Sequence, residues 1–363
     1  MLNKIQTSNP GEADVENILF GSCPLPILNH KEIVLGHGSG GKLTHQLIEK
    51  MILPQFKNDI LDPLHDGAIL SVNGVNLAFS TDSFVVNPIF FPGGDIGKLA
   101  VHGTVNDLAM CGARPLYLSV GMILEEGLPM EELWRITKSM RAAADEAGVM
   151  LVTGDTKVVD RGKADKIFIN TAGIGVIGPG INIHPRRARA GDKIIINGQI
   201  ADHGIAIMSV REGLDFESEI ISDTAPLNSL VAAILTTCPD THVLRDPTRG
   251  GVTSALSEIA EQAKVGIRLD EAAIPISEAV RGACEILGLD PLYVANEGKL
   301  LAIVPAADAD QVLKAMRAHA LGRDAAIIGE VVADHPELMT MKTRVGGSRV
   351  VDMLSGEQLP RIC

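Results

Sequence analysis

The pattern of apolar residues is interrupted near the middle of this chain of 363 residues and then starts again, which constrains the fold more than any other feature. On both sides of the interruption, alternating stretches typical of strands are mixed with helical stretches that end at a glycine. The interruption lies at Gly178-Pro179-Gly180 and the basic run after it, and the pattern restarts at Lys193–Asn197. We therefore predict an α/β (α+β) protein with two mixed domains, over residues 33–180 and 181–345.

The two ends of the chain fit neither domain. Residues 1–32 are polar and show no sustained periodicity, so we expect an irregular N-terminal extension. Residues 346–363 are expected to form a flexible tail, and its last part, from Ser355 to Cys363, reaches about 30 Å when extended. A cysteine at the end of such a tail is able to leave the surface and enter a site elsewhere on the molecule.

The composition excludes several classes of protein. A formal charge of −13 and an aromatic content of 3% oppose nucleic-acid binding, because phosphates are repelled and few rings are present to stack on bases. No apolar stretch approaches the roughly 20 residues of a membrane span, and the start of the chain does not resemble a secretory signal. The five cysteines are never spaced as Cys-x-x-Cys, which argues against a disulfide framework or a zinc ribbon. We expect a cytoplasmic protein with neither nucleic-acid nor membrane partners.

A glycine-rich run, residues 36–42, follows a predicted strand at Glu32–Leu35 and precedes a predicted helix, so its backbone N–H groups suit an anion. The run matches a dinucleotide fingerprint, a P-loop in which Leu43 replaces the required Ser or Thr, or a mobile lid over phosphates bound elsewhere. A helix-capping turn without a ligand is the fourth interpretation. The candidate ligand-binding residues in this run are Gly38, Gly40, Gly41 and Lys42.

Four aspartates lie beside small or polar residues at predicted element ends. Each of them alone also suits a turn or a helix cap. Magnesium prefers hard oxygen ligands and usually binds a few carboxylates together with phosphate oxygens, so their joint occurrence predicts a magnesium site. The predicted ligands are Asp66, Asp82, Asp107 and Asp155.

Further candidates surround these aspartates. Lys157 follows Asp155 by two residues on a predicted strand, so both point to one face, either as a base beside the metal or as a surface ion pair. The Arg245–Gly251 turn enters a helix with Asp246 and Arg249, which suits either a phosphate clamp or a capped surface turn. Glu297 lies at the entrance of a predicted strand, where a solvated turn is the alternative. The isolated histidines His37, His102 and His203 receive no role.

Taken together, these motifs resemble the HypE family, the carbamoyl dehydratases of NiFe hydrogenase maturation. The resemblance extends from about Ile33 to Cys363, and the final tetrapeptide is its most specific part. The segments that carry it are residues 37–42, Gly103–Met110, Gly154-Asp155-Thr156-Lys157, Arg245–Gly251, Asn296-Glu297-Gly298-Lys299 and Pro360-Arg361-Ile362-Cys363.

The resemblance implies a fold related to aminoimidazole ribonucleotide synthetase, with the N-terminal domains paired in a homodimer. It implies ATP and Mg2+ near the four aspartates and under the glycine-rich run, with Asn106, Arg245, Asp246 and Arg249 among the ATP-binding residues. In such a protein Cys363 receives a carbamoyl group from the carbamoyltransferase HypF. ATP then drives its dehydration to an S-cyanide, which passes to iron on the HypC–HypD complex.

Phosphorylation of the carbamoyl oxygen makes it a good leaving group, after which a base takes the nitrogen proton. By the resemblance, Lys157 and Glu297 match the positions of this proton relay. Arg361 is expected to favour the Cys363 thiolate, whereas the adjacent terminal carboxylate opposes it.

Two enzymes with the same predicted fold are alternatives. Selenophosphate synthetase and aminoimidazole ribonucleotide synthetase share the ATP site without requiring a terminal cysteine. The former normally presents its reactive Cys or selenocysteine in the N-terminal glycine-rich region, where this chain has His37 and Ser39. A non-catalytic carrier or assembly scaffold is an alternative of another class, from which ATP turnover dependent on a carbamoylated tail distinguishes the dehydratase.

Overall fold

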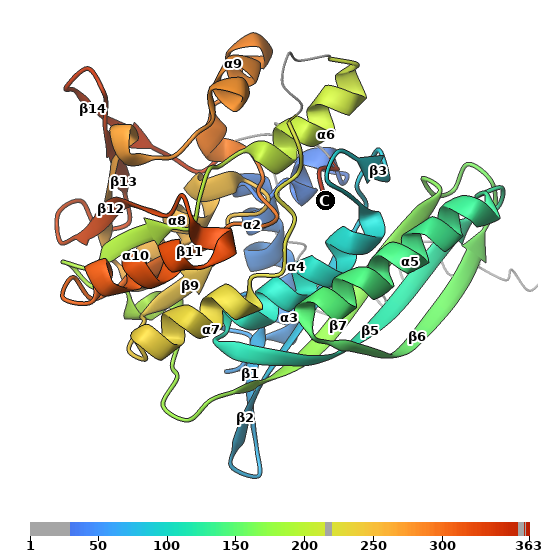
Figure 1. Cartoon of the computed structure of the whole chain (residues 1–363), viewed down its shortest axis with the longest axis horizontal. Coiled ribbons are helices and arrows are strands. Elements are labelled where there is room, and N and C mark those ends of the chain that lie inside the picture. The colour runs from blue at the N-terminus through green and yellow to red at the C-terminus, as the bar shows by residue number, and fades with distance from the viewer. Residues whose placement is uncertain (1–29, 215–219, 355–358, 360) are drawn as a thin grey trace, which may run out of the picture.

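Two sheets with helices packed on them form two lobes in the computed structural model of the protein (Figure 1). The structure describes residues 30–214, 220–354, 359 and 361–363. The expected extension over residues 1–32 lies almost wholly outside these ranges, and so do residues 355–358 and 360 of the expected tail. Within the described ranges, no helix combines the length and the apolar character needed to cross a bilayer.

The first sheet is antiparallel except for the β5–β6 pair. Its five strands lie in the order β1 (Ala68–Val72), β2 (Val75–Phe84), β7 (Ile167–Ile177), β5 (Ala113–Glu125) and β6 (Met150–Val159). Along β7 every second side chain is buried, as the alternating sequence predicted. The helices α4 (Ile96–Met110) and α5 (Met130–Ala147) pack on one face of this sheet (Figure 1), preceded by a small hairpin of β3 (Phe90–Phe91) and β4 (Gly94–Asp95).

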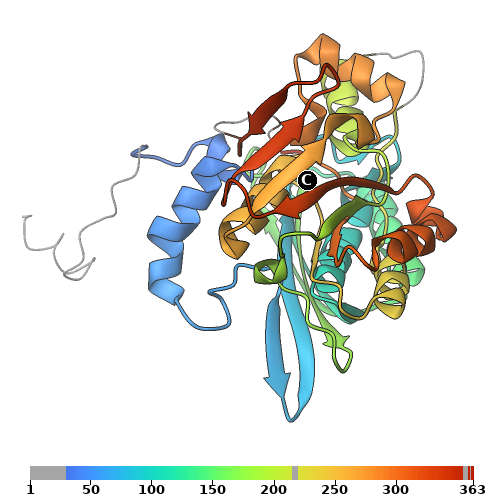
Figure 2. The same ribbon diagram turned by 90° about the vertical axis from the view of Figure 1, so that its left-hand side faces the viewer.

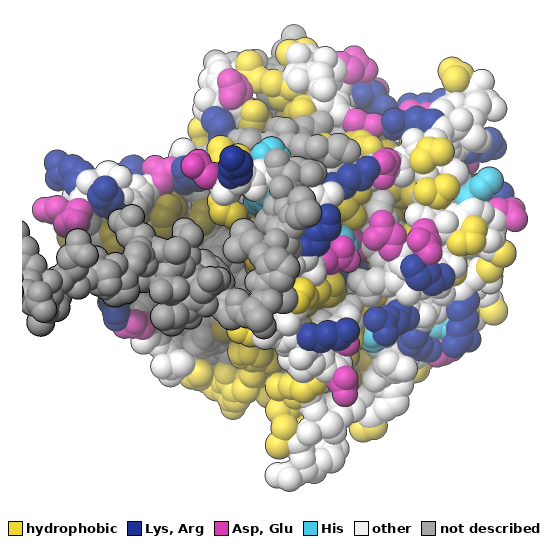
Figure 3. Space-filling view, turned by 180° about the vertical axis from the view of Figure 1, so that it is seen from behind, with side chains coloured by type: hydrophobic (Ala, Val, Ile, Leu, Met, Phe, Trp, Pro, Cys, Tyr) yellow, Lys and Arg dark blue, Asp and Glu magenta, His cyan; other side chains and the backbone are white. Residues whose placement is uncertain are grey.

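The opposite face of the first sheet, here called the open face, carries exposed apolar side chains. Phe79, Tyr117, Ile123 and Ile174 lie on it with 38–44% of their surface exposed. Hydrophobic side chains gather beside the β1–β2 hairpin when the molecule is seen from behind (Figure 3). An apolar patch of this kind on a sheet is typical of a surface that another protein covers.

Helix α4 is the central element of the first lobe, because it is buried on nearly all sides. Asp95 caps its start by accepting hydrogen bonds from the N–H groups of Gly97 at 2.8 Å and Lys98 at 3.1 Å. Gly112, with φ of 74°, lies just after its end. Both α4 and α5 are followed by a glycine, as the sequence predicted for its helical stretches, and α5 ends at Gly148 in the left-handed conformation.

The second sheet mixes parallel and antiparallel pairs, and its interior strand β8 contributes three fully buried isoleucines, Ile194–Ile196, to the cores on both faces. Its seven strands lie in the order β14 (Ser348–Val351), β13 (Met339–Lys342), β10 (Gly266–Asp270), β12 (Ala326–Val332), β8 (Lys193–Ile196), β11 (Leu301–Val304) and β9 (Val243–Arg245). The helices of this lobe are α6 (Asp202–Glu212), α7 (Asn228–Thr237), α8 (Gly251–Ala263), α9 (Glu278–Leu287) and α10 (Ala309–Ala318). Short 3-10 turns occupy Pro185–Arg187, Glu271–Ala273, Pro291–Tyr293 and Ala320–Gly322.

Two expectations about the ends of the domains were wrong. No strand forms at Glu32–Leu35, where exposed side chains lead into the 3-10 turn Leu35–Gly38, because this segment pairs with no strand that the structure describes. The strand β14 pairs with β13, so the second sheet continues past residue 345 into the expected tail. The helical segment after the glycine-rich run consists of α2 (Lys42–Leu47), a π-helical turn at Ile48–Ile52 and α3 (Leu53–Phe56), and it lies at the edge of the molecule (Figure 2).

The cap of α4 yields the first prediction. Replacement of Asp95 by Ala leaves two helix N–H groups without their acceptor and should lower the free energy of unfolding by about 1 kcal/mol, read from urea denaturation. Asp95→Asn keeps a side-chain acceptor and should retain most of the stability. Equal losses in the two variants would show that the cap does not stabilise α4.

Candidate functional site

The first lobe brings three of the four predicted metal-binding aspartates together. On β2, the Ser80 hydroxyl lies 2.8 Å from both the carbonyl oxygen of Asp66 and the Oδ2 of Asp107 on α4. Asp82 is two residues further along β2 and therefore points to the same side of the sheet, toward α4. Gly103 on α4 leaves room for the Phe84 ring, which would lie 2.8 Å from a Cβ there, and the Asp82 carboxylate lies 3.8 Å from the same point.

The second lobe adds charged groups of both signs through the turn after β9. Arg245 Nη1 pairs with Asp66 Oδ1 at 2.8 Å, and its Nη2 pairs with Glu258 Oε2 at 2.5 Å. Burial, followed by the charge of Asp66, raises the pKa of Asp246 from 3.8 to about 8. The sequence placed Asp246 with the ATP-binding residues, and the structure places it among the carboxylates.

These carboxylates repel one another in a buried space. Burial raises the pKa of Asp107 well above its ordinary value, and the charges of Asp246, Asp82 and Asp66 add to that rise. Burial also raises the pKa of Asp82, against the attraction of Arg249. The Oδ2 atom of Asp66 is buried without a hydrogen-bond partner among the described residues. We name Asp66, Asp82, Asp107 and Asp246 the carboxylate cluster.

The carboxylate cluster fits a divalent cation, because a positive charge would relieve its repulsion and its donors are hard oxygens. Among the described residues, no three His, Cys, Asp or Glu side chains are arranged to hold a metal ion by themselves. Mg2+ usually binds through one or two carboxylates and takes its other ligands from water and substrate phosphates.

The end of the chain is seated beside this cluster. The backbone N–H of Val85 donates to a main-chain carboxylate oxygen of Cys363 at 3.0 Å, and the N–H of Asn87 donates to Arg361 O at 3.3 Å. Arg211 Nη2 donates to the same Arg361 oxygen at 2.9 Å. The Cys363 side chain is buried. The mobile arm expected from the sequence therefore has a seat formed by the segment after β2.

The Cys363 sulfur lies within the electrostatic reach of Arg249, Glu297 and two members of the carboxylate cluster. Burial raises the pKa of the Cys363 thiol, and Arg249 opposes the rise. The carboxylates of Glu297, Asp82 and Asp246 add to it. The expectation that Arg361 favours the thiolate was wrong, since its side chain pairs with Asp165 and donates to Val85 O at 3.1 Å. Arg249 supplies the positive charge at the sulfur.

Glu297 is the most buried candidate base. Burial raises its pKa well above the ordinary value, and Asp82, Asp246 and then Asp223 add to the rise. Its Oε1 atom has no hydrogen-bond partner within the described ranges. Asn106, which the resemblance assigned to ATP binding, donates to the backbone oxygens of Glu297 at 3.3 Å and Ala225 at 3.1 Å.

The glycine-rich run packs against both the Arg249 turn and the segment before the tail. A Cβ on Gly40, whose φ is 74°, would lie 2.7 Å from Arg249 O, and one on Gly41 would lie 2.5 Å from Leu354 O. Lys42 pairs with Asp352 at 2.5 Å. A Cβ on Gly38 would meet nothing within 4 Å. The run therefore touches the site through its backbone, and the Lys42 ammonium group is held by a carboxylate.

Asp155 and Lys157 form the predicted pair on β6, with 2.6 Å between Lys157 Nζ and Asp155 Oδ2. The register places Asp155 in one row with Ser83 of β2, on the open face. Two strands separate β6 from β2, which is about 14 Å across the sheet at the usual strand spacing. Within one chain, Asp155 therefore does not join the carboxylate cluster, which lies on the other face. Both residues of the pair line a cavity of about 460 Å³ on the open face.

Some residues that shape the site gave no signal in the sequence. Asp223 and Ser222 lie outside every motif, and the isolated His203 received no role, yet His203 contacts the tail, Ser222 contacts His203, and Asp223 contacts the Glu297 turn. Their partners are far away in the sequence and are mostly backbone atoms, so no spacing rule identifies them.

Comparisons with known proteins agree on one family. The models for the AIR synthase related protein N-terminal and C-terminal domains match residues 64–177 and 189–341. The carbamoyl dehydratase HypE of Azotobacter vinelandii is 56% identical over 336 residues, which cover 93% of this chain and 98% of that protein.

Two solved structures are similar over most of their length. One, a HypE–HypF complex, superposes with a TM-score of 0.81 at 49% identity and covers 85% of this chain and 99% of the matched one. The other, a hydrogenase maturation protein HypE in complex with ATP, gives a TM-score of 0.78 at 52% identity and covers 92% of this chain and 100% of the matched one.

The raised pKa of Asp246 leads to a pH-dependent prediction. Because the folded state binds the proton more tightly than the unfolded state, Asp246 lowers stability progressively as the pH rises from about 4 to about 8. Without added Mg2+, Asp246→Asn should therefore be more stable than the wild type. Its gain in free energy of unfolding should be about 1–3 kcal/mol larger at pH 8.5 than at pH 5. Urea denaturation at both pH values measures this difference, and a gain that is independent of pH would contradict it.

Proposed function

The chain belongs to the HypE family of carbamoyl dehydratases, within the AIR synthase related proteins, and from this membership we propose that it dehydrates a carbamoyl group carried on its own Cys363. The reaction is driven by ATP and yields an S-cyanide for hydrogenase maturation. The single observation that carries the assignment to this chain is the seat of Cys363, where the sulfur lies beside Arg249, Glu297 and the carboxylate cluster.

The proposed reaction converts S–C(=O)–NH2 into S–C≡N. ATP supplies the phosphoryl group that turns the carbamoyl oxygen into a leaving group, and Mg2+ screens the charge of its phosphates. The remaining requirement is removal of the nitrogen protons as phosphate departs. Glu297 suits this task, because burial has raised its pKa and its charge acts on the sulfur that carries the group.

The other charged residues receive roles from their positions. We propose that Asp66, Asp82, Asp107 and Asp246 hold Mg2+, and that Arg249 stabilises negative charge that develops beside Cys363. Arg245 orients Asp66 by an ion pair. The glycine-rich run, with Gly38, Gly40, Gly41 and Lys42, would cover the ATP phosphates from the side of the Arg249 turn.

A homodimer accounts for the position of Asp155 and Lys157. Both lie on the open face, away from the cluster of their own chain, among the exposed Phe79, Tyr117 and Ile123. We propose that two copies pair through this face, so that each chain brings Lys157 as a base, and Asp155 as a metal ligand, to the site of its partner. Burial of these apolar side chains would stabilise the pair.

Partners follow from the proposed chemistry. The carbamoyl group must be delivered to the Cys363 sulfur, and we propose HypF as the donor, in keeping with the HypE–HypF complex that this chain resembles. We also propose that the S-cyanide passes to the HypC–HypD complex. The described cysteines form no disulfide, which suits the reducing cytoplasm where we place the protein.

Replacement of Cys363 tests the activity directly. Cys363→Ala should abolish formation of the nitrile and leave ATP binding largely intact, because the sulfur carries the reacting group and not the nucleotide. Mass spectrometry of the C-terminal peptide, after incubation with HypF, carbamoyl phosphate and Mg-ATP, measures carbamoylation followed by loss of one water. The control is Cys284→Ala, at a buried cysteine of the second lobe, which should retain the reaction. Loss of ATP binding in Cys363→Ala would contradict this division of roles.

Coexpression of two inactive variants tests the exchange of Lys157 between chains. Lys157→Ala and Glu297→Gln should each be inactive, whereas a random mixture should regain about a quarter of the wild-type activity, because half of the dimers are mixed and each has one intact site. Purification by two different affinity tags isolates the mixed dimer. No recovery in that fraction would show that Lys157 and Glu297 act within the same chain.

A further inference from the structure

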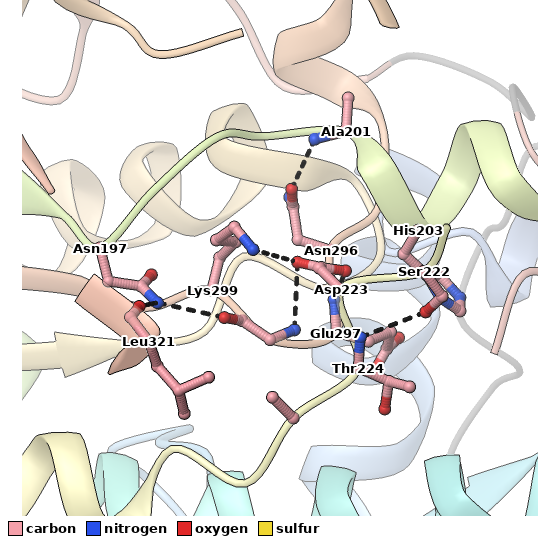
Figure 4. A network of polar contacts seen from close by, with 12 residues as sticks. Asn197, Ala201, His203, Ser222, Asp223, Thr224, Asn296, Glu297, Lys299 and Leu321 are labelled. Carbon is pink, nitrogen blue, oxygen red and sulfur yellow. Dashed lines mark hydrogen bonds and ion pairs between the residues drawn. The ribbon is translucent and has the colours of Figure 1, made fainter. Parts of the chain in front are cut away.

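The segment Ser222–Thr224 contacts the Glu297 turn directly and is linked to the chain terminus through His203 (Figure 4 shows Ser222, Asp223, His203 and Glu297). Its own position is fixed by the first lobe, since Ser222 N–H donates to Pro92 O at 2.8 Å. A Cβ on Gly93 would lie 2.8 Å from Ser222 O, so the two backbones are in close contact. The segment therefore connects the first lobe to two reactive parts of the second.

A chain of hydrogen bonds leads from this segment to the tail. Thr224 N–H donates to Ser222 Oγ at 3.2 Å, Ser222 Oγ lies 2.8 Å from His203 Nδ1, and His203 Nε2 lies 2.8 Å from Ile362 O. A carbonyl oxygen only accepts, so Nε2 carries the proton. In the neutral ring Nδ1 is then the acceptor, and Ser222 donates its hydroxyl hydrogen to it. Ser222 thus selects the tautomer of His203 that binds the tail.

The surroundings of His203 favour this neutral ring. The side chain has no exposed surface, and its ring meets the Phe91 ring edge to face with 5.5 Å between centroids. Burial lowers the pKa of His203, although Asp223 opposes the shift. The hydrogen bond reaches Ile362 O, one residue before the reactive cysteine, so a small displacement of the ring moves Cys363 as well.

The next residue of the segment fixes the Glu297 turn. Asp223 accepts hydrogen bonds from the backbone N–H groups of Glu297 at 3.1 Å and Gly298 at 3.2 Å, and pairs with Lys299 Nζ at 2.9 Å. A Cβ at residue 298 would lie 1.8 Å from Asp223 O, so only glycine permits this approach. Asp223 therefore holds the backbone from which the Glu297 carboxyl projects.

We propose that Ser222 and Asp223 are positioning residues for the dehydration, with His203 and Ser222 seating the tail that carries Cys363 and Asp223 orienting Glu297. One short segment then sets the position of the sulfur relative to the base. The catalytic meaning of this arrangement rests on the proposed function, whereas the seating of the tail is a property of the resting protein and is measured without any turnover.

The seat is tested by the rate at which iodoacetamide alkylates Cys363 in the full-length protein, resolved by peptide mass spectrometry. His203→Leu removes the donor to Ile362 O, which leaves a buried acceptor unpaired, and should raise the Cys363 rate about tenfold, because alkylation follows the population of the open tail. His203→Gln keeps an N–H donor near the position of Nε2 and should restore slow alkylation. The buried Cys111, Cys238 and Cys284 should remain protected in both variants, which establishes that they are folded.

A matched pair of serine variants isolates the role of Ser222. Ser222→Ala should also speed alkylation of Cys363. Ser229→Ala breaks a comparable contact, 3.2 Å to His319 Nε2, on the exposed start of α7 and should leave the rate unchanged. Equal alkylation of Cys363 in the wild type, His203→Leu and Ser222→Ala, with the other thiols protected, would overturn the proposed seat.

The role of Asp223 is tested with carbamoylated protein. Asp223→Asn should lower the rate constant for loss of water about tenfold or more with the ATP concentration dependence unchanged, and Cys363 should stay as protected as in the wild type. A wild-type rate, or a loss confined to ATP affinity, would overturn this half of the proposal. If the carbamoylated wild type does not lose water with Mg-ATP, the proposed function fails, while the alkylation series still decides whether His203 and Ser222 seat the tail.

Discussion

Repulsion among buried carboxylates is the interaction on which the rest of the site depends. Asp66, Asp82, Asp107 and Asp246 share a space from which water is largely excluded, and burial is the first cause of the raised pKa values of the last three. An arrangement of this kind is costly for an isolated protein, and it persists because the packing of α4 on the first sheet and the Arg245 ion pair hold the groups in place. The same cost becomes an advantage when a cation with phosphate oxygens enters, since binding then relieves a repulsion that is already present.

The two lobes contribute different chemical groups to the site, and the difference follows from their structures. The first lobe supplies rigid oxygen donors from a buried helix and a central strand. The second lobe supplies Asp246, the arginines and Glu297 from turns at strand ends, close to the terminus of the chain. Segment 220–227 crosses between the two lobes. The Asn106 side chain of α4 therefore forms hydrogen bonds with backbone groups of both this segment and the Glu297 turn. Relative movement of the lobes would therefore alter the distance between the carboxylates of the first lobe and Glu297.

Much of the fold could be predicted from the sequence, because local signals were strong. Asp95, Gly112 and Gly148 marked the ends of α4 and α5, and strict alternation marked β7. The motifs also named most of the residues that the structure brings together. What could not be predicted depends on contacts between distant residues: the exposed Glu32–Leu35 segment finds no strand partner in the described chain, whereas β14 forms because β13 lies beside it. The same holds for Asp223, which acts on backbone atoms 74 and 75 residues away.

The way in which the tail is held bears on its chemistry. The contacts that seat it involve main-chain oxygens of Arg361, Ile362 and Cys363, which bond Asn87, His203 and Val85. None of these contacts uses the sulfur atom. The same seat is therefore able to accept the free thiol, the carbamoylated sulfur and the nitrile without exchanging its hydrogen bonds, and the three states differ in the group that meets Arg249 and Glu297. Preference among them must then come from charge and volume at the sulfur, where burial opposes a thiolate and favours a neutral adduct. A seat of this design holds the tail for each step. Release of the product then depends on breaking a few main-chain hydrogen bonds, whose strength the reaction does not change.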